Sequence, residues 1–405
     1  MRFPYKIFIK ISLLNLLIIA ALGTLMRYKI GFEFPYFEQK NLQLAHSHFA
    51  FTGWASHSLF CLIIYYFKDS LNEIKIQKYK YLIILNLCFA YGILLSFLFY
   101  GYSLLSFSLS FGAIFVSYLF TYLFYKDFKA QLKSNPAVKW ILAAMVYNVI
   151  SSLGLINIAY LILNHHLSSH AFLGSQYFYL HFQYNGWFLL GCIGIFVGLL
   201  HNAGLELNDK TIFRLIAYTC LPTFLLSILW LHLPNWLYAI CVIATILQLV
   251  GLLKLWQKII LLRLEIAKIF NRLIISLLIL SGIALSAKML LQFGSIFPTI
   301  SKLAYGFRPI VVAYLHLILL GAISTFILSS LIKYKKMPLL KSGLVGLLVL
   351  IVGIYLTEII LLIQGVASFA YFAVPMINES LFVVAFFMFV GILLLLFSWK
   401  DGREN

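Results

Sequence analysis

The chain has 405 residues, of which 63% are hydrophobic and 10% are charged, and this composition excludes an ordinary soluble globular protein. Lys and Arg outnumber Asp and Glu by 30 to 12. These cations fall between apolar runs, which argues against a nucleic-acid partner and for a lipid bilayer as the surroundings. The composition therefore predicts an integral membrane protein.

Twelve apolar runs are long enough to cross about 30 Å of hydrocarbon as helices. The first continues into Met26 and Arg27 without a clear small-residue cleavage site, so we expect a retained span rather than a signal peptide. The runs lie near 7–26, 43–67, 80–100, 103–125, 138–163, 177–201, 212–231, 235–256, 272–294, 308–333, 340–364 and 380–399. The sequence predicts an all-α integral membrane fold, with residues 1–405 forming a single transmembrane domain.

The connections between the runs indicate how the chain is oriented. Cations gather after even-numbered runs, for example in Lys68–Lys80 and Lys254–Arg272, whereas "YGYS" and "HLPN" after odd-numbered runs have none. The exceptions after odd-numbered runs are Arg27, Lys29, Lys40, Lys302 and Arg308. Cytoplasmic loops carry the excess of Lys and Arg, so both termini are predicted to be cytoplasmic. The many Lys, Ile, Asn, Phe and Tyr residues suggest an AT-rich bacterial genome, so we expect a bacterial inner membrane.

A repeat is visible in the spans. Run 2 begins "HFAFTGW" at His48, run 6 has "HFQYNGW" at His181, and run 10 has "HLILLGA" at His316. The histidines are 133 residues (181 − 48) and 135 residues (316 − 181) apart, which is four spans each time. The twelve helices are therefore predicted to form three pseudo-repeated four-helix units, about 1–135, 136–270 and 271–405.

Each unit would carry one histidine at a similar depth in the outer part of the bilayer. An intramembrane histidine is by default a hypothesis of function. Imidazole is a common axial ligand of haem and a common ligand of copper. The alternative is an interfacial histidine that binds a backbone carbonyl, but three histidines at equivalent positions favour haem or metal ligation.

Together these features resemble subunit I of the haem-copper oxidase superfamily, which includes cytochrome c oxidases, nitric oxide reductases and, more distantly, NnrS-like proteins. In that family the histidine of helix 2 and one of helix 10 hold a low-spin haem, which implies a haem, most simply b-type, at His48 and His316. The family's helix 6 histidine binds copper or non-haem iron, which implies a metal site at His181. Arg27, Lys302 and Arg308 are candidate partners of haem propionates.

The chain also departs from the family pattern. Run 10 reads "AYLHLIL", with Tyr314 where the family has a second histidine. Run 7 ends "LWLHLPNW" and offers only His232 in place of an adjacent histidine pair. The family's His-Pro-Glu-Val-Tyr sequence is replaced by "HFQYN". The sequence therefore predicts one haem and no complete dioxygen-reducing centre.

Other titratable residues are weaker candidates. His46 is two residues from His48, about 200° around a helix, so both cannot point into one site. His57 is expected to be a polar packing residue. Lys288 and Glu358 lie inside apolar runs, as an ion pair or in a proton-relay or propionate role. The outer loop "NHHLSSHAF" contains His165, His166 and His170, either solvated or as a copper or zinc relay.

Two classes of function remain. The first is a haem-binding protein, with copper as a second candidate cofactor, in electron transfer or in nitric oxide or oxygen chemistry. Filled axial positions at His48 and His316 favour electron transfer, whereas a five-coordinate haem at His316 facing a metal at His181 would make the protein a haem-dependent oxidoreductase. Electrons would come from cytochrome c, quinol or a companion membrane subunit.

The second class is a non-catalytic membrane protein that handles copper or haem, in nitrosative stress or in oxidase assembly. A transporter of organic solutes is disfavoured, because the spans contain few charges and none is expected to be short or broken by Gly or Pro.

Overall fold

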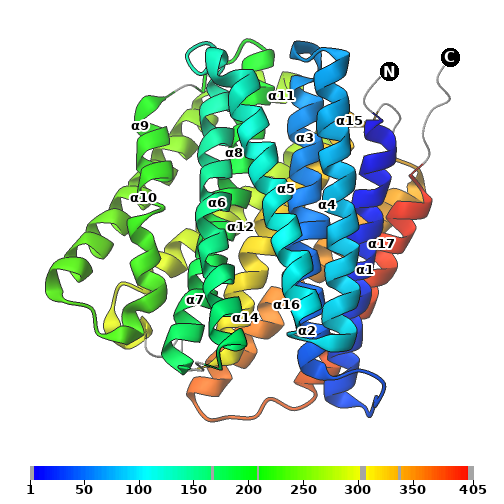
Figure 1. The fold of residues 1–405 in the computed structure, drawn as a ribbon, viewed down its shortest axis with the longest axis vertical. Helices are drawn as coiled ribbons and strands as arrows, with labels where there is room; N and C mark the ends of the chain where they lie inside the picture. Colours follow the sequence, from blue (N-terminus) through cyan, green and yellow to red (C-terminus); the bar gives the residue numbers. More distant parts are fainter. Residues whose placement is uncertain (1–3, 166–167, 208, 302–306, 336–338, 400–405) are drawn as a thin grey trace. The chain divides into compact units, whose positions relative to one another are not determined.

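The computed structural model describes residues 4–165, 168–207, 209–301, 307–335 and 339–399 (Figure 1). Within these ranges every regular element is a helix, and twelve helical segments are long and apolar enough to cross a membrane. Each of the twelve runs predicted from the sequence has its counterpart among these segments. The prediction of an all-α, twelve-span membrane protein is therefore confirmed.

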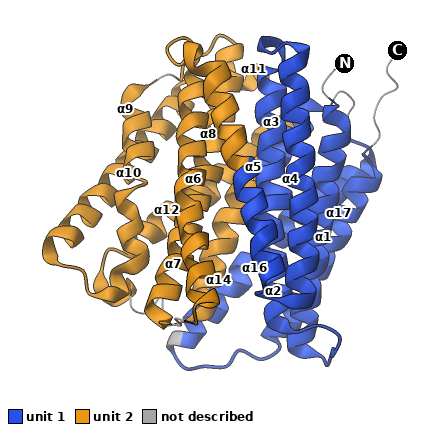
Figure 2. Ribbon diagram, viewed as in Figure 1, with its two compact units in different colours: residues 1–116, 327–405 blue, residues 117–326 orange. Residues whose placement is uncertain are grey.

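The chain divides into two compact units, residues 1–116 with 327–405 (unit 1) and residues 117–326 (unit 2), which are coloured separately in Figure 2. Their limits do not coincide with the predicted repeat boundaries near 135 and 270. The division into two units does not test the prediction of a single domain built from three repeats, which stays a prediction.

Unit 1 joins the two ends of the chain. Its elements are α1 (Tyr5–Gly31), α2 (Gln39–Phe49), the π-helix η1 (Ala50–Ser56), α3 (His57–Phe67), the 3₁₀ turn η2 (Lys68–Ser70), α4 (Glu73–Tyr100), α16 (Lys341–Phe369) and α17 (Ile377–Phe397). Helices α1 and α17 lie side by side (Figure 1). Thr24 Oγ1 of α1 donates to the Ala385 carbonyl of α17 at 3.1 Å.

Glycines allow α16 and α17 to approach closely. A Cβ atom on Gly346 would lie 2.5 Å from the carbonyl oxygen of Gly391, and one on Gly391 would lie 2.7 Å from that of Gly346. Small residues at such crossings are typical of membrane helices, where packing rather than the hydrophobic effect holds the helices together.

Unit 2 contains the middle of the chain, and α5 (Leu104–Phe128) and α15 (Thr325–Tyr334) connect it in sequence to unit 1. Its elements are η3 (Lys129–Gln131), α6 (Pro136–Leu163), α7 (Ser169–His181), η4 (Phe182–Phe188), α8 (Leu189–Asn202), α9 (Lys210–Phe213), η5 (Arg214–Tyr218), η6 (Pro222–Leu231), α10 (Asn235–Leu261), α11 (Arg263–Ile269), α12 (Arg272–Gly294), α14 (Arg308–His316) and η7 (Leu317–Ser324). Helix α6 begins with a capping Asn135 side chain followed by Pro136, a typical helix start.

Span 7 is not a regular α-helix, and the expectation that no span is broken by Gly or Pro is wrong here. The short α9 passes into the π-helix η5, and a 3₁₀-helix, η6, begins at Pro222. Proline has no backbone N–H to continue the helix. Ile228 inside η6 has non-helical angles, and His232 after it is left-handed with φ 53°. Unbroken spans therefore no longer argue against a solute transporter.

Candidate functional site

All three repeat histidines stand just before a π-helical segment. Segment η1 begins two residues after His48, whereas η4 and η7 begin at the residue that follows His181 and His316. A further π-helix, η5, lies in span 7. Such segments are rare in proteins, and those that occur often lie at functional sites. The same local deviation therefore follows each of the three histidines, while the threefold repeat itself stays a prediction.

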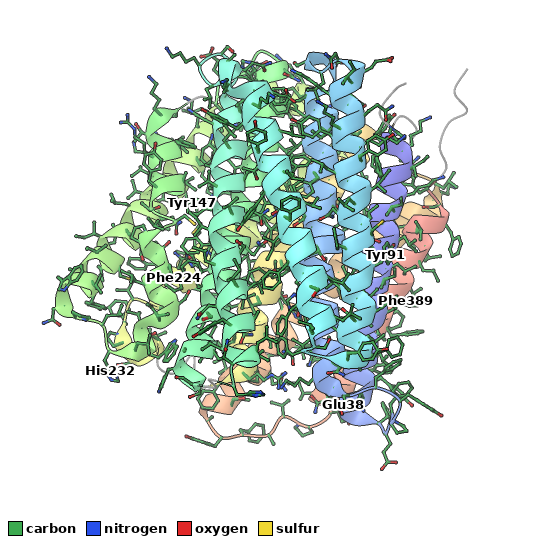
Figure 3. All side chains as sticks on the ribbon, viewed as in Figure 1. Glu38, Tyr91, Tyr147, Phe224, His232 and Phe389 are labelled. Carbon is green, nitrogen blue, oxygen red and sulfur yellow. The ribbon has the colours of Figure 1, made fainter. Side chains whose placement is uncertain are left out.

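Side chains from neighbouring helices donate hydrogen bonds to carbonyls in three of these segments, η1, η5 and η7. In unit 1, Asn15 Nδ2 on α1 donates to the Gly53 carbonyl of η1, and Tyr91, labelled in Figure 3, donates to Asn15 Oδ1 at 2.6 Å. In unit 2, Ser281 Oγ on α12 donates to the Ala322 carbonyl of η7 at 2.7 Å. A backbone group within a bilayer needs a protein partner, so these side chains stabilise the π-helices.

The second repeat uses a related residue. Asn148 lies 133 residues after Asn15 (148 − 15), the spacing that separates the first two histidines. Its Oδ1 accepts a hydrogen bond from Gln183 Nε2 of η4 at 2.8 Å, and Gln183 also donates to Ser151 Oγ at 2.7 Å. The equal spacing of these two asparagines is a signal in the sequence for this pair of contacts.

Replacing Asn15 by leucine is expected to destabilise η1. The Gly53 carbonyl and the Tyr91 hydroxyl would lose a buried partner, at about 1–3 kcal/mol for each group left unsatisfied. Hydrogen exchange of amides 50–56 should accelerate more than that of amides 182–188 in unit 2. Leucine at the exposed Asn164 is the control, and equal exchange in both variants would show that Asn15 does not hold η1.

A chain of polar side chains begins beside η4 in unit 2. His181 is 2% exposed, and its Nε2 donates to the Cys220 carbonyl at 2.9 Å, in the break between η5 and η6. Asn185 Nδ2 donates to His181 Nδ1 at 3.1 Å. This network assigns a neutral imidazole with its proton on Nε2. Phe224, labelled in Figure 3, meets the His181 ring edge to face at a centroid distance of 5.8 Å.

The network of hydrogen-bonded side chains continues to α12. Lys288 is 0% exposed, and its Nζ donates to Asn185 Oδ1 and to Gln292 Oε1. Gln292 Nε2 then donates to Gln248 Oε1 on α10 at 2.7 Å. Lys288 is therefore the donor at the centre of this network, and the hydrogen bonds on both sides point away from it.

Two tyrosine rings lie beside the same amine. Lys288 Nζ is 5.9 Å from the ring centroid of Tyr184 in η4 and 5.9 Å from that of Tyr314 in α14. The two rings meet edge to face at 6.1 Å. Tyr314, the residue two positions before His316, therefore contacts the lysine site.

The predicted haem ligands belong to different compact units. His48 on α2 is half-buried and stacks on Phe97 of α4, with ring centroids 4.3 Å apart and planes 10° apart. His316 is half-buried and is the last residue of α14. Joint ligation of one haem by the two residues therefore stays a prediction.

His46 and His57 contact the backbone of α1. His46 Nδ1 lies 3.1 Å from the Ile19 carbonyl oxygen, and His57 Nε2 lies 3.3 Å from that of Phe8. His46 therefore faces α1 while His48 faces α4, in agreement with their spacing along α2. His57 has the packing contacts expected from the sequence.

Of the two predicted copper ligands, His181 is buried and His232 is exposed. Both ring nitrogens of His181 are in hydrogen bonds, so neither is open to a metal ion in this arrangement. His232, labelled in Figure 3, is exposed in the connection between η6 and α10. Across the described ranges no cluster of three or more His, Cys, Asp or Glu residues is arranged to hold a metal ion.

The loop histidines and the arginines lie nearer the ends of the helices. His165 has a positive φ of 55°, and His170 stacks on Trp230 at 5.3 Å. Arg27 lies near the end of α1, and Arg308 is exposed at the start of α14. The predicted candidates outside the described residues are His166 and Lys302.

Glu358 lies on α16 in unit 1. Its Oε1 is buried and has no hydrogen-bond partner among the described residues. Lys288 belongs to unit 2, where its hydrogen bonds go to the side-chain amides of Asn185 and Gln292. The predicted ion pair between Lys288 and Glu358 stays a prediction.

No family model matches the chain, and no curated protein is significantly similar to it. The fold defines the class of protein as a twelve-span α-helical membrane protein. The resemblance to haem-copper oxidases stays a prediction from the sequence.

Proposed function

We propose that the chain is a haem-binding inner-membrane protein, similar to subunit I of the haem-copper oxidases, and that it transfers electrons through one haem held by His48 and His316. The observation that carries this proposal is the histidine followed by a π-helix on three repeat-equivalent helices. Three copies of an unusual local structure, each beside an imidazole, are difficult to attribute to packing alone.

The donors fit a haem in their chemistry. Imidazole is a common axial ligand, and His48 and His316 each lie on the α-helix that leads into a π-helix. A haem held by these two residues would supply a one-electron couple. The protein's part is to orient the two rings, as Phe97 does for His48 by stacking. Arg27 and Arg308 are the proposed partners of the propionates.

The middle repeat does not fit a copper site, because the lone pair of His181 Nδ1 accepts from Asn185 and its Nε2 proton is donated to Cys220. Tyr314 likewise replaces the histidine that a second haem would need. We therefore propose electron transfer rather than reduction of oxygen or nitric oxide. The redox partner would be cytochrome c, quinol or a companion membrane subunit, with both termini of this chain in the bacterial cytoplasm.

The proposal is tested by measuring haem per chain after expression in a haem-replete host. His48→Ala and His316→Ala are each expected to lower bound haem by more than about tenfold, because each removes an axial ligand. His181→Ala is the matched control from the third repeat-equivalent helix and should keep its haem. Loss in the control alone, or retention in both ligand variants, would contradict the assignment.

A further inference from the structure

The geometry points to a second site that does not depend on haem: we propose that Lys288 is a proton-binding site in the interior of unit 2. Its amine rests uncharged between two amide oxygens and takes up one proton. The site has no counterpart in the other repeats, since the residues at the equivalent positions are apolar.

The surroundings of Lys288 are polar but uncharged. The side chain is fully buried, and Nζ reaches Asn185 Oδ1, Gln292 Oε1 and, at 3.9 Å, the sulfur of Met289. Among the described residues, none of its hydrogen-bond partners is a carboxylate. A buried ammonium without a counter-charge is costly, because its desolvation is not repaid by an ion pair.

The number of acceptors matches a neutral amine. An uncharged amine has two N–H groups and one lone pair, and the site offers two good acceptors, the oxygens of Asn185 and Gln292. An ammonium has three N–H groups. The third would have only the weakly accepting Met289 sulfur and the tyrosine rings. The lone pair of the uncharged amine is therefore available to bind a proton.

The tyrosines provide for the protonated form. Tyr184 and Tyr314 each present a ring centroid 5.9 Å from Nζ, within the range at which aromatic faces attract a cation. Uptake forms one N–H bond from the nitrogen lone pair and breaks one O–H bond of a hydronium ion, which is left as water. The same side chain thus has partners in both states.

The groups that face this amine come from several elements. They are His181 of α7, Tyr184 of η4, Tyr314 of α14 and the buried Cys220 of span 7, while α10 contributes the uncharged Gln248 through Gln292. His181 is held neutral by its two hydrogen bonds. Asn185 bonds both Lys288 and His181, and His181 bonds the Cys220 carbonyl. A proton gained at Lys288 therefore adds a charge at one end of the hydrogen bonds that lead to the break in span 7.

Nitrogen NMR of protein labelled with ¹⁵N at lysine Nζ tests this directly. At neutral pH we expect one neutral-amine signal among ammonium signals, lost in Lys288→Met and kept in Lys10→Met, a change at an exposed residue of α1. On acidification of the folded wild type, the signal should become that of an ammonium. A wild-type spectrum containing only ammonium signals would overturn the proposal, as would a neutral-amine signal that survives in Lys288→Met.

A second variant keeps the test independent of whether Lys288→Met folds. Gln292→Glu preserves the shape of the side chain and places a carboxylate beside Nζ, so the amine should be an ammonium at neutral pH. A neutral-amine signal that persists in Gln292→Glu would contradict the proposal. None of these measurements requires bound haem, so a protein without haem would remove the proposed function and leave this inference standing.

Discussion

Replacing Asn185 by leucine is expected to lower the free energy of unfolding by about 2–6 kcal/mol. Two buried groups would lose a partner at once, His181 Nδ1 and Lys288 Nζ, and each unsatisfied buried group costs about 1–3 kcal/mol. Leucine is similar in size to asparagine, so the loss should reflect hydrogen bonding more than volume. Equilibrium unfolding of the purified protein in mixed micelles measures the difference.

The matched control for Asn185 is Thr52, the residue 133 positions earlier (185 − 133) in η1. The Thr52 hydroxyl donates only to the His48 carbonyl of its own helix, at 2.8 Å. Thr52→Val should therefore cost less than about 1 kcal/mol. If Thr52→Val and Asn185→Leu destabilise the protein equally, the polar chain around Lys288 does not contribute to stability as described.

Replacing Trp187 by alanine should have a comparably large effect, about 3–5 kcal/mol. Trp187 lies in η4 and is 0% exposed. Lipid tails are as apolar as the protein interior, so the cost comes from lost packing contacts and an unfilled cavity rather than from transfer to water. Unfolding in the same mixed micelles gives the magnitude.

Trp236 provides the comparison for Trp187. It lies at the start of α10 and is 64% exposed. Trp236→Ala should change stability by no more than about 0.5 kcal/mol. An equal cost for the two tryptophan variants would mean that η4 is not as tightly packed as described.

The spans were predictable because the bilayer allows few solutions. A chain within hydrocarbon must satisfy its backbone groups internally, so long apolar runs become helices whatever their detailed sequence. The π-helices were not predictable, because "HFAFTGW" and "HLILLGA" contain no residue that distinguishes a π-turn from an α-turn. The break in span 7 has a visible signal, Pro222, but proline is tolerated in membrane helices and does not by itself predict a 3₁₀ segment.

The candidate site was predictable in part. Lys288 was found because a charge inside an apolar run is unusual. Its partners Asn185, Gln292 and Gln248 were not, because they come from three different elements and only the packing of η4, α12 and α10 brings them together. The sequence pattern predicts a metal ligand at His181, because it cannot show the hydrogen-bond partners of the ring nitrogens. The structure places a partner at each of them.

The three histidine-bearing helices therefore differ in the surroundings of their histidines. In the middle repeat, His181 is fixed by Cys220 and Asn185 and leads to Lys288. The first and third repeats keep His48 and His316 as proposed haem ligands. The proposed haem ligands and the lysine site thus lie on different histidine-bearing helices.

The most direct test of the haem proposal is a reduced-minus-oxidised optical spectrum of the purified wild-type protein, recorded with and without carbon monoxide and combined with a pyridine haemochrome assay. We predict one b-type haem per chain with a low-spin spectrum that carbon monoxide leaves unchanged, because both axial positions are filled. A colourless protein from a haem-replete host, or a haem that binds carbon monoxide, would contradict the proposal.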